Sequence, residues 1–321
     1  MNVGWGMHTL PSVCAEAGVV APLLVSSPRW DGLDLPLEVV GRWNEVPSDR
    51  IDAAAEQAGG ADGIVALGGG SAIDLGKALS SVVELPLVSV PTTYSGAEWT
   101  TYYGIRSPDR LMRGGGAGAR PTGIVYEPEL TLDLPRETTV GTAMNALAHC
   151  AEALYAQGHN ADADEHALAG ARLIAEWLPC VVESPHDLEA RAGLLRGACE
   201  GGAALAGSML ALAHAMAQAV GGRYGLPHGT LNAICLPAAL RYNAQYAPDA
   251  VRRFGEAIGA DPAAGAEALA TLGAATHLRE LGVPEADLPE LAELASQRAG
   301  NLANPHPATP GEIEELLRSV W

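Results

Sequence analysis

Short apolar runs alternate with helix-like stretches along the first quarter of the chain. Residues 22–26 (Pro-Leu-Leu-Val-Ser) and 63–67 (Gly-Ile-Val-Ala-Leu) are predicted to be buried strands, and a third apolar run covers 85–90. Between the first two runs, residues 48–58 have helical spacing and begin with Ser48, a favourable capping residue. Because such alternation is typical of parallel strands joined by helical crossovers, we expect a doubly wound α/β domain with a parallel sheet.

From Leu134 onward the pattern changes to an Ala-, Leu- and Glu-rich helical periodicity with few β-branched runs. This predicts an all-α second domain, with the boundary near residue 135, so that the domains are 1–135 and 136–321. The glycine run at 114–118 is predicted to be a flexible loop between the halves, and residues 310–320 a last short helix. A chain of 321 residues exceeds one ordinary core. We therefore expect two domains that share a cleft for a small ligand.

Composition and charge narrow the function classes. The net charge of −19 opposes binding to a nucleic-acid backbone, and no Lys or Arg cluster compensates for it. No apolar run reaches the roughly 18 residues of a membrane span, and residues 1–5 lack the features of an export signal. The sequence thus predicts a cytoplasmic protein without nucleic-acid or membrane partners. The five cysteines have no CxxC spacing and receive no role.

A glycine turn follows the strand predicted at 63–67. Gly68-Gly69-Gly70-Ser71 leads directly into helical spacing, and a strand, a turn without side chains and a helix N-terminus together form an anion site. Asp74 and Lys77, the only lysine of the chain, share the next helical face and favour this interpretation. The pyrophosphate of a dinucleotide would fit at this turn. The alternative is a tight turn with Ser71 as a helix cap.

A second polar segment, Pro91-Thr92-Thr93-Tyr94-Ser95-Gly96-Ala97-Glu98, follows the apolar run at 85–90. Hydroxyl groups at the carboxyl end of a parallel strand lie where α/β folds bind nucleotides. Thr92 and Thr93 are therefore candidate cofactor contacts.

The helical half carries a set of histidines. Asn145 and His149 are four residues apart and share one helix face, with Glu152 one turn further on. His214 lies in an otherwise apolar helix, and His228 stands in a loop that leads into the next helix. Each histidine alone is more often a hydrogen-bonded core residue, but their combination favours a reaction site.

These motifs, in this order, resemble the iron-containing alcohol dehydrogenase superfamily: Gly68-Gly69-Gly70-Ser71-x-x-Asp74-x-x-Lys77, Pro91-Thr92-Thr93, Asn145-x-x-x-His149, His214 and Pro227-His228. Within it, the segments 91–98, 124–132, 144–150 and 221–228 are most similar to maleylacetate reductases. The resemblance implies a dehydroquinate synthase-like fold, hydride transfer from NADH or NADPH in the cleft between the domains, and a homodimer.

The resemblance also implies residue roles. Gly69, Gly70 and Ser71 would hold the pyrophosphate, with Asp74, Thr92 and Thr93 near the nicotinamide. Ser27 stands where relatives that use NAD often carry an acidic residue, and Arg29 is close enough in sequence to meet a 2′-phosphate, so both cofactors are expected. His149, His214 and His228 correspond to the metal ligands of metal-dependent members, where Asn145 is replaced by Asp.

The implied reaction is reduction of the C=C bond of maleylacetate to 3-oxoadipate, or a similar step on a small anionic carboxylate. Arg223 is a candidate clamp for a substrate carboxylate, with a surface arginine as the alternative. One of the histidines, or Tyr94, would supply the proton. Because neutral Asn145 replaces a negatively charged ligand, we expect activity without a tightly bound divalent metal.

Two departures from the family pattern leave other functions open. Gln218 occupies a position where the family has a second histidine, and the chain before Ser48 is shorter than in its relatives. The alternatives are a metal-dependent alcohol dehydrogenase and a non-redox lyase, isomerase or cyclase on the same scaffold. A binding or scaffold protein without catalysis fits the histidine set least well.

Overall fold

The computed structural model describes residues 1–273 and 275–321, which form two compact units. The α/β unit comprises Met1–Thr93 and Ala97–Thr131, and the helical unit comprises Tyr94–Gly96 and Leu132–Trp321. The sequence placed the boundary near 135 and did not anticipate that three residues of the 91–98 segment belong to the helical unit.

A parallel sheet forms the α/β unit. Among the described residues its strand order is β1-β8-β5-β4-β2-β3, and every neighbouring pair is parallel. The strands are β1 (Asn2–Trp5), β2 (Leu23–Ser26), β3 (Gly41–Trp43), β4 (Ile64–Gly68), β5 (Leu87–Pro91) and β8 (Pro121–Tyr126). This confirms the predicted α/β class, although the sequence interpretation did not identify β1, β3 or β8 as strands.

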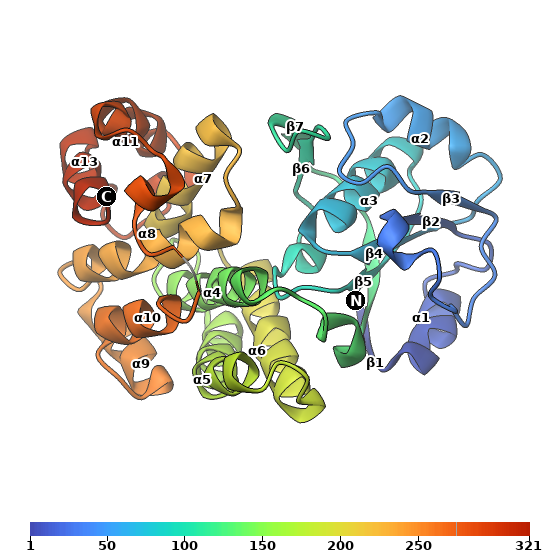
Figure 1. Ribbon diagram of the computed structural model, residues 1–321, viewed down its shortest axis with the longest axis horizontal. Coiled ribbons are helices and arrows are strands. Elements are labelled where there is room, and N and C mark those ends of the chain that lie inside the picture. Colours follow the sequence, from blue (N-terminus) through green and yellow to red (C-terminus); the bar gives the residue numbers. More distant parts are fainter. Residues whose placement is uncertain (274) are drawn as a thin grey trace. The chain divides into compact units, whose positions relative to one another are not determined.

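Helices cover both faces of this sheet. They are α1 (Leu10–Glu16), α2 (Ile51–Gln57) and α3 (Gly70–Val83), with 3-10 turns η1 (Met7–Thr9), η2 (Pro28–Trp30), η3 (Ala97–Trp99) and η4 (Pro128–Thr131). Alternate residues of β4 enter two separate cores: Val65 packs with Leu10 of α1, whereas Ile64 packs with Leu75 of α3. Figure 1 shows α1 on the side of the sheet away from α2 and α3. Burial on both faces explains why these strands are apolar throughout.

Two sequence expectations for the α/β unit were wrong. Helix α2 begins at Ile51 rather than at Ser48, because Arg50 has a non-helical backbone (φ −86°, ψ 57°) and its N–H donates to Ser48 Oγ in a turn before the helix. The glycine run is not a loop between the halves. Its first three glycines, Gly114–Gly116, lie in β7 (Met112–Gly116), which pairs antiparallel with β6 (Tyr103–Arg106). A Cβ on Gly115 would lie 2.8 Å from the Tyr103 carbonyl oxygen, so the close pairing requires glycine.

The helical unit is all-α, as predicted. Its helices are α4 (Arg136–Ala153), α5 (Ala161–Glu183), α6 (Leu188–Ala206), α7 (Leu212–Tyr224), α8 (His228–Asn243), α9 (Pro248–Ile258), α10 (Pro262–Ala270), α11 (Leu288–Ser296), α12 (Ala299–Leu302) and α13 (Pro310–Ser319), with 3-10 turns η5 (Leu278–Leu281) and η6 (Glu285–Asp287). Helix α4 packs against α5, α6, α8 and α10 and is buried around most of its circumference (Figure 1). No helix within the described ranges is both long and apolar enough to cross a membrane.

Candidate functional site

The predicted cofactor residues of the α/β unit lie together at the carboxyl edge of its sheet. Strand pairing places Ser26 opposite Leu67 and Gly68 opposite Pro91. Ser27, the turn at 68–71 and the segment that starts with Thr92 therefore follow three adjacent strands. This is the edge at which parallel α/β sheets bind nucleotides.

The glycine turn is closely packed against Ala72 and Thr93. Gly68 has φ +150°, and a Cβ there would lie 2.7 Å from Ala72 Cβ. A Cβ on Gly69 would lie 2.9 Å from Thr93 Cγ2. Helix α3 starts at Gly70, so its first N–H groups and the positive end of its dipole face the turn. Ser71, in the first turn of α3, lines a small hollow together with Ser48 and Arg106.

Asp74 and Lys77 bind the protein itself. Lys77 Nζ lies 2.9 Å from Asp74 Oδ1 and donates to the carbonyl oxygens of Ala97, at 2.7 Å, and Tyr102. The other Asp74 oxygen accepts from the Gly104 N–H at 3.2 Å. Both side chains thus fasten α3 to the segment that leads into β6. The role of Asp74 as a cofactor contact stays a prediction, and in this structure both its oxygens bind groups of the protein itself.

Thr92 and Thr93 differ in their surroundings. The Thr92 N–H donates to the Gly68 carbonyl oxygen at 3.0 Å and so joins the second segment to the glycine turn. Thr93 Oγ1 is buried and has no hydrogen-bond partner among the described residues. A buried hydroxyl without a partner is costly, so Thr93 is the better candidate for binding a ligand.

In the helical unit, Asn145 lies at the centre of the predicted cluster. Its Nδ2 donates to the Ser95 carbonyl oxygen at 2.8 Å and lies 3.4 Å from His149 Nε2. Its Oδ1 accepts from Asn232 Nδ2 at 2.7 Å and lies 3.3 Å from His214 Nε2. These hydrogen bonds fix the orientation of the Asn145 amide. A flip that exchanged its oxygen and nitrogen would lose the bonds to Ser95 and Asn232.

The three histidines lie next to one another. The rings of His149 and His214 stack with centroids 4.8 Å apart, and the rings of His214 and His228 are 5.5 Å apart. His228 is the first residue of α8, and its Nε2 lies 3.0 Å from Asn232 Nδ2. The structure thus brings Asn145, His149, His214 and His228 into one cluster, as the sequence predicted.

A buried carboxylate orients His214. Glu152 is fully buried, and its Oε2 accepts from His214 Nδ1 at 2.6 Å and from the Ala211 N–H at 2.8 Å. Because an ionised carboxylate can only accept, Nδ1 of His214 carries the proton and Nε2 is turned toward Asn145.

His149 is buried next to the other two histidines. Burial, with His214 and His228 close by, holds the pKa of its imidazole well below its usual value, so the ring is neutral near pH 7. Its Nδ1 is buried without a hydrogen-bond partner among the described residues. Gly96 passes directly over this ring at φ +75°, and a Cβ there would lie 3.2 Å from Nδ1.

Sequence reasoning missed three members of this site: Asn232, Glu152 as a partner of His214, and the Ser95 carbonyl. Asn232 follows His228 by four residues on α8, which is the same spacing as Asn145 and His149 on α4. That repeated spacing was a readable signal. The Ser95 carbonyl gives no such signal, since a backbone oxygen has no residue type.

Two other predicted residues do not join the cluster. Arg223 Nη1 donates to Glu290 Oε1 at 2.9 Å, and the side chain is 40% exposed, so it forms a surface ion pair and is not a free carboxylate clamp. Tyr94 is fully buried, and its hydroxyl accepts from Arg191 Nη1 at 3.2 Å. This burial argues against Tyr94 as a proton donor to a substrate.

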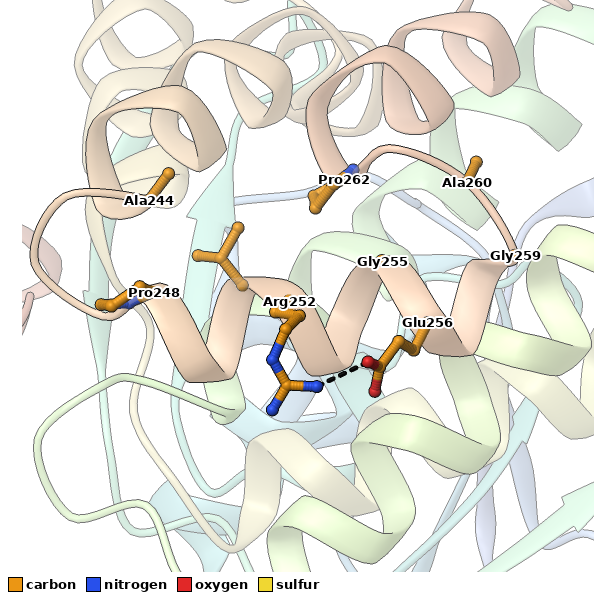
Figure 2. Close-up of a pocket in the computed structure, with 9 residues that line it drawn as sticks. Ala244, Pro248, Arg252, Gly255, Glu256, Gly259, Ala260 and Pro262 are labelled. Atoms are coloured by element: carbon orange, nitrogen blue, oxygen red, sulfur yellow. Dashed lines mark hydrogen bonds and ion pairs between the residues drawn. The ribbon is translucent and has the colours of Figure 1, made fainter.

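A hollow of about 550 Å³ lies elsewhere in the helical unit, along α9. Figure 2 shows Arg252 and Glu256, two of the residues that line it, bound to each other at 2.5 Å. None of the predicted site residues lines it. We therefore place one candidate site at the glycine turn of the α/β unit and another at the Asn145 cluster of the helical unit.

The chain matches known families over most of its length. A family model described as "Iron-containing alcohol dehydrogenase" matches residues 10–120, and one described as "Fe-containing alcohol dehydrogenase family, C-terminal" matches residues 139–321. A maleylacetate reductase of Sphingobium indicum is 38% identical over 276 residues, which cover 85% of this chain and 78% of that protein. Maleylacetate reductase 1 of Cupriavidus pinatubonensis is 34% identical over 328 residues, covering 97% and 92%. The crystal structure of maleylacetate reductase from Agrobacterium tumefaciens, 31% identical, has a TM-score of 0.90 and covers 100% of this chain and 95% of that one.

The family match overturns the prediction that activity does not require a tightly bound metal, because members of the matched iron-containing family typically bind a divalent metal ion. The prediction counted only the charges of direct ligands and found neutral Asn145. It left out Glu152, whose buried carboxylate lies 2.6 Å from His214 Nδ1. A carboxylate behind a histidine compensates part of a cation's charge through the ring.

The chemistry of the cluster fits a divalent ion. His149, His214 and His228 offer imidazole nitrogens, which suit iron and zinc, and Glu152 already holds the tautomer in which Nε2 of His214 can act as a ligand. Within residues 1–273 and 275–321, no three His, Cys, Asp or Glu side chains lie at metal-ligand spacing. Binding an ion would therefore draw the three rings together.

Proposed function

Because the chain belongs to the iron-containing alcohol dehydrogenase family, we propose that it transfers a hydride from NADH or NADPH to the C=C bond of maleylacetate or of a similar small unsaturated or keto carboxylate. The observation that carries the proposal is the Asn145 cluster, in which His149, His214 and His228 surround one fixed amide. The chain is an NAD(P)-dependent oxidoreductase of the maleylacetate reductase type.

The α/β unit supplies the cofactor site in this proposal. Gly69, Gly70 and Ser71 bind the pyrophosphate through backbone N–H groups at the start of α3. Thr93, with its unpartnered hydroxyl, binds nearer the nicotinamide. Ser27 leaves room for either a ribose hydroxyl or a 2′-phosphate, so both cofactors are accepted.

The helical unit supplies the groups that act on the substrate. The hydride leaves the dihydronicotinamide with its electron pair and bonds to one alkene carbon, and the alkene electrons move onto the conjugated carbonyl oxygen as an enolate. Imidazole N–H groups of the cluster stabilise that charge, and a proton then bonds to the second carbon. His228 is partly exposed whereas His149 and His214 are buried, so His228 is the histidine that solvent can reprotonate.

A divalent ion held by His149, His214 and His228 would supply Lewis acidity at the carbonyl oxygen. The proposal extends to an anionic substrate, a homodimeric assembly and a cytoplasmic location, as predicted from the sequence.

The direct test is turnover of maleylacetate by the purified protein with NADH and with NADPH, with and without added Fe²⁺ or Zn²⁺. We expect oxidation of the cofactor together with formation of 3-oxoadipate. His149→Ala and His228→Ala should each lower kcat by about two to four orders of magnitude. His186→Ala, at an exposed position, is the matched control. Metal-dependent oxidation of simple alcohols without maleylacetate turnover would instead assign an alcohol dehydrogenase, and conversion without cofactor oxidation a non-redox enzyme.

A further inference from the structure

Arg191 is a fully buried arginine that the proposed reaction does not use. It lies on α6, its side chain is 1% exposed, and its guanidinium donates to four oxygens. The acceptors are the carbonyl oxygens of Pro185 (2.9 Å) and Leu132 (3.3 Å) and the hydroxyls of Tyr94 (3.2 Å) and Thr139 (3.1 Å). All four are neutral. A guanidinium keeps its charge at any ordinary pH, and burying it costs free energy unless hydrogen bonds replace its water.

Tyr94 connects Arg191 to the Asn145 cluster through the chain segment that it begins. Tyr94 begins the three-residue segment, Tyr94–Gly96, that belongs to the helical unit although its neighbours in sequence do not. The next residue, Ser95, accepts the hydrogen bond from Asn145 Nδ2 at 2.8 Å. Gly96 then covers the His149 ring, with its own Cβ position 3.2 Å from Nδ1. The segment thus sets both the orientation of the Asn145 amide and the space beside His149.

A short segment of this kind does not fix its own position. It has no secondary structure, so the Tyr94 side chain, which is fully buried, is its anchor. The phenol oxygen of that anchor meets Arg191, whose other three bonds hold the guanidinium in place. We propose that Arg191 and Tyr94 are positioning residues for the reaction: they touch neither substrate nor cofactor, and they hold the Ser95 carbonyl where it fixes the Asn145 amide among the histidines. This inference rests on the proposed function of the Asn145 cluster.

The test compares two hydroxyl deletions at the same guanidinium nitrogen. Tyr94→Phe and Thr139→Val each remove one acceptor of Arg191 Nη1, at 3.2 and 3.1 Å, but only Tyr94 belongs to the segment that contacts Asn145. We expect Tyr94→Phe to lower kcat by about 10- to 100-fold, as small misplacements of reacting groups do, while the Kd for NADH stays unchanged. Thr139→Val should keep the wild-type kcat. Equal kcat losses in both variants, or none in Tyr94→Phe, would overturn the proposal.

A second readout does not depend on turnover. The side-chain amide of Asn145 gives an NMR signal that can be assigned by its disappearance in Asn145→Asp. We expect this signal to shift in Tyr94→Phe and in Arg191→Lys but not in Thr139→Val. If the wild-type protein does not turn over maleylacetate, the proposed function fails, and this amide signal alone decides the positioning role. An unshifted signal in Tyr94→Phe contradicts it in either case.

Discussion

Position 96 illustrates how strongly a single residue can be constrained. Gly96 combines φ +75° with a Cβ position 3.2 Å from His149 Nδ1, so alanine would meet both a strained backbone and a crowded ring. We expect Gly96→Ala to lower the free energy of unfolding by about 1–3 kcal/mol and to reduce kcat. Urea denaturation and initial rates measure the two effects. Gly114→Ala is the control, because its new Cβ meets nothing within 4 Å. Its unfolding free energy and kcat should both stay close to wild type.

Glu98 makes stability depend on pH. Tyr126 donates to its Oε1 at 2.7 Å, but burial dominates and raises the pKa of this carboxyl above its usual 4.5. The charge of Lys77 lowers the pKa of Glu98, and the charge of Asp74 raises it. A raised folded-state pKa favours the native protein below the unfolded value, and this contribution is lost as pH rises through the folded pKa. Glu98→Gln should therefore gain stability relative to wild type as pH rises from 4.5 toward 7.

Denaturant unfolding at several pH values measures this difference. Asp109→Asn is the control, because hydrogen bonding by Ser107 lowers the pKa of Asp109 and the group is ionised in both states above pH 5. The difference in unfolding free energy between Asp109→Asn and wild type should not change between pH 5 and 7. A flat difference for Glu98→Gln as well would show that Glu98 is ionised in the folded protein.

Glu152 offers a test of metal binding at the histidine cluster. Its carboxylate accepts from His214 Nδ1 at 2.6 Å, and the loss of such a partner typically weakens metal affinity by about 10- to 100-fold. We expect Glu152→Gln to weaken binding of Fe²⁺ or Zn²⁺ by that amount, measured by equilibrium dialysis after treatment with a chelator. Glu129→Gln, on η4 of the α/β unit, is the control variant. Equal metal affinity in both variants would show that Glu152 does not contribute to metal binding.

At the scale of elements, the start of α3 is the proposed nucleotide-binding element. A Cβ on Gly69 would already lie 2.9 Å from Thr93 Cγ2, and valine adds two further methyl groups beside the proposed pyrophosphate site. We expect Gly69→Val to raise the Kd for NADH by roughly 100-fold or more, equivalent to about 3 kcal/mol. Titration calorimetry measures this, and Gly32→Val, at an exposed position with nothing within 4 Å, is the control. Unchanged affinity in Gly69→Val would place the nucleotide elsewhere.

The elements also show what the sequence could predict. Asn145 and His149 were placed together correctly because four residues on one helix define a common face. The pairing of Lys77 with Asp74 could be expected from their shared helix face, but its bonds to the backbone oxygens at 97 and 102 could not, since no residue type reveals them. Arg223 was misjudged for a related reason: its partner Glu290 comes from α11, 67 residues further along. Local periodicity thus identified strands β2, β4 and β5 and the helical character of the second unit, whereas long-range pairing between polar groups required the structure.

For the whole molecule, the net charge of −19 predicts an unusual salt dependence. Both the nicotinamide cofactor and a carboxylate substrate are anions, and at low ionic strength the protein repels them over about 10 Å or more. We expect KM for NADPH to fall by roughly two- to tenfold as salt is raised from a low concentration to about 0.2 M. Steady-state rates at fixed pH provide the measurement. A KM that rises with salt would mean that arginines near the site, such as Arg106, outweigh the total charge.

The segment Tyr94–Gly96 affects how this protein can exchange parts with its relatives. A crossover near residue 135 would transfer a helical unit without the three residues that contact Asn145 and His149, because these lie some forty positions upstream. Chimeras joined at that point would pair a helical half from one parent with residues 94–96 from another. Recombination between homologues is therefore expected to preserve function only where this tripeptide is inherited together with the C-terminal half. The residues that have to be inherited together are therefore discontinuous in sequence, and exchanging one contiguous half of the chain would separate them.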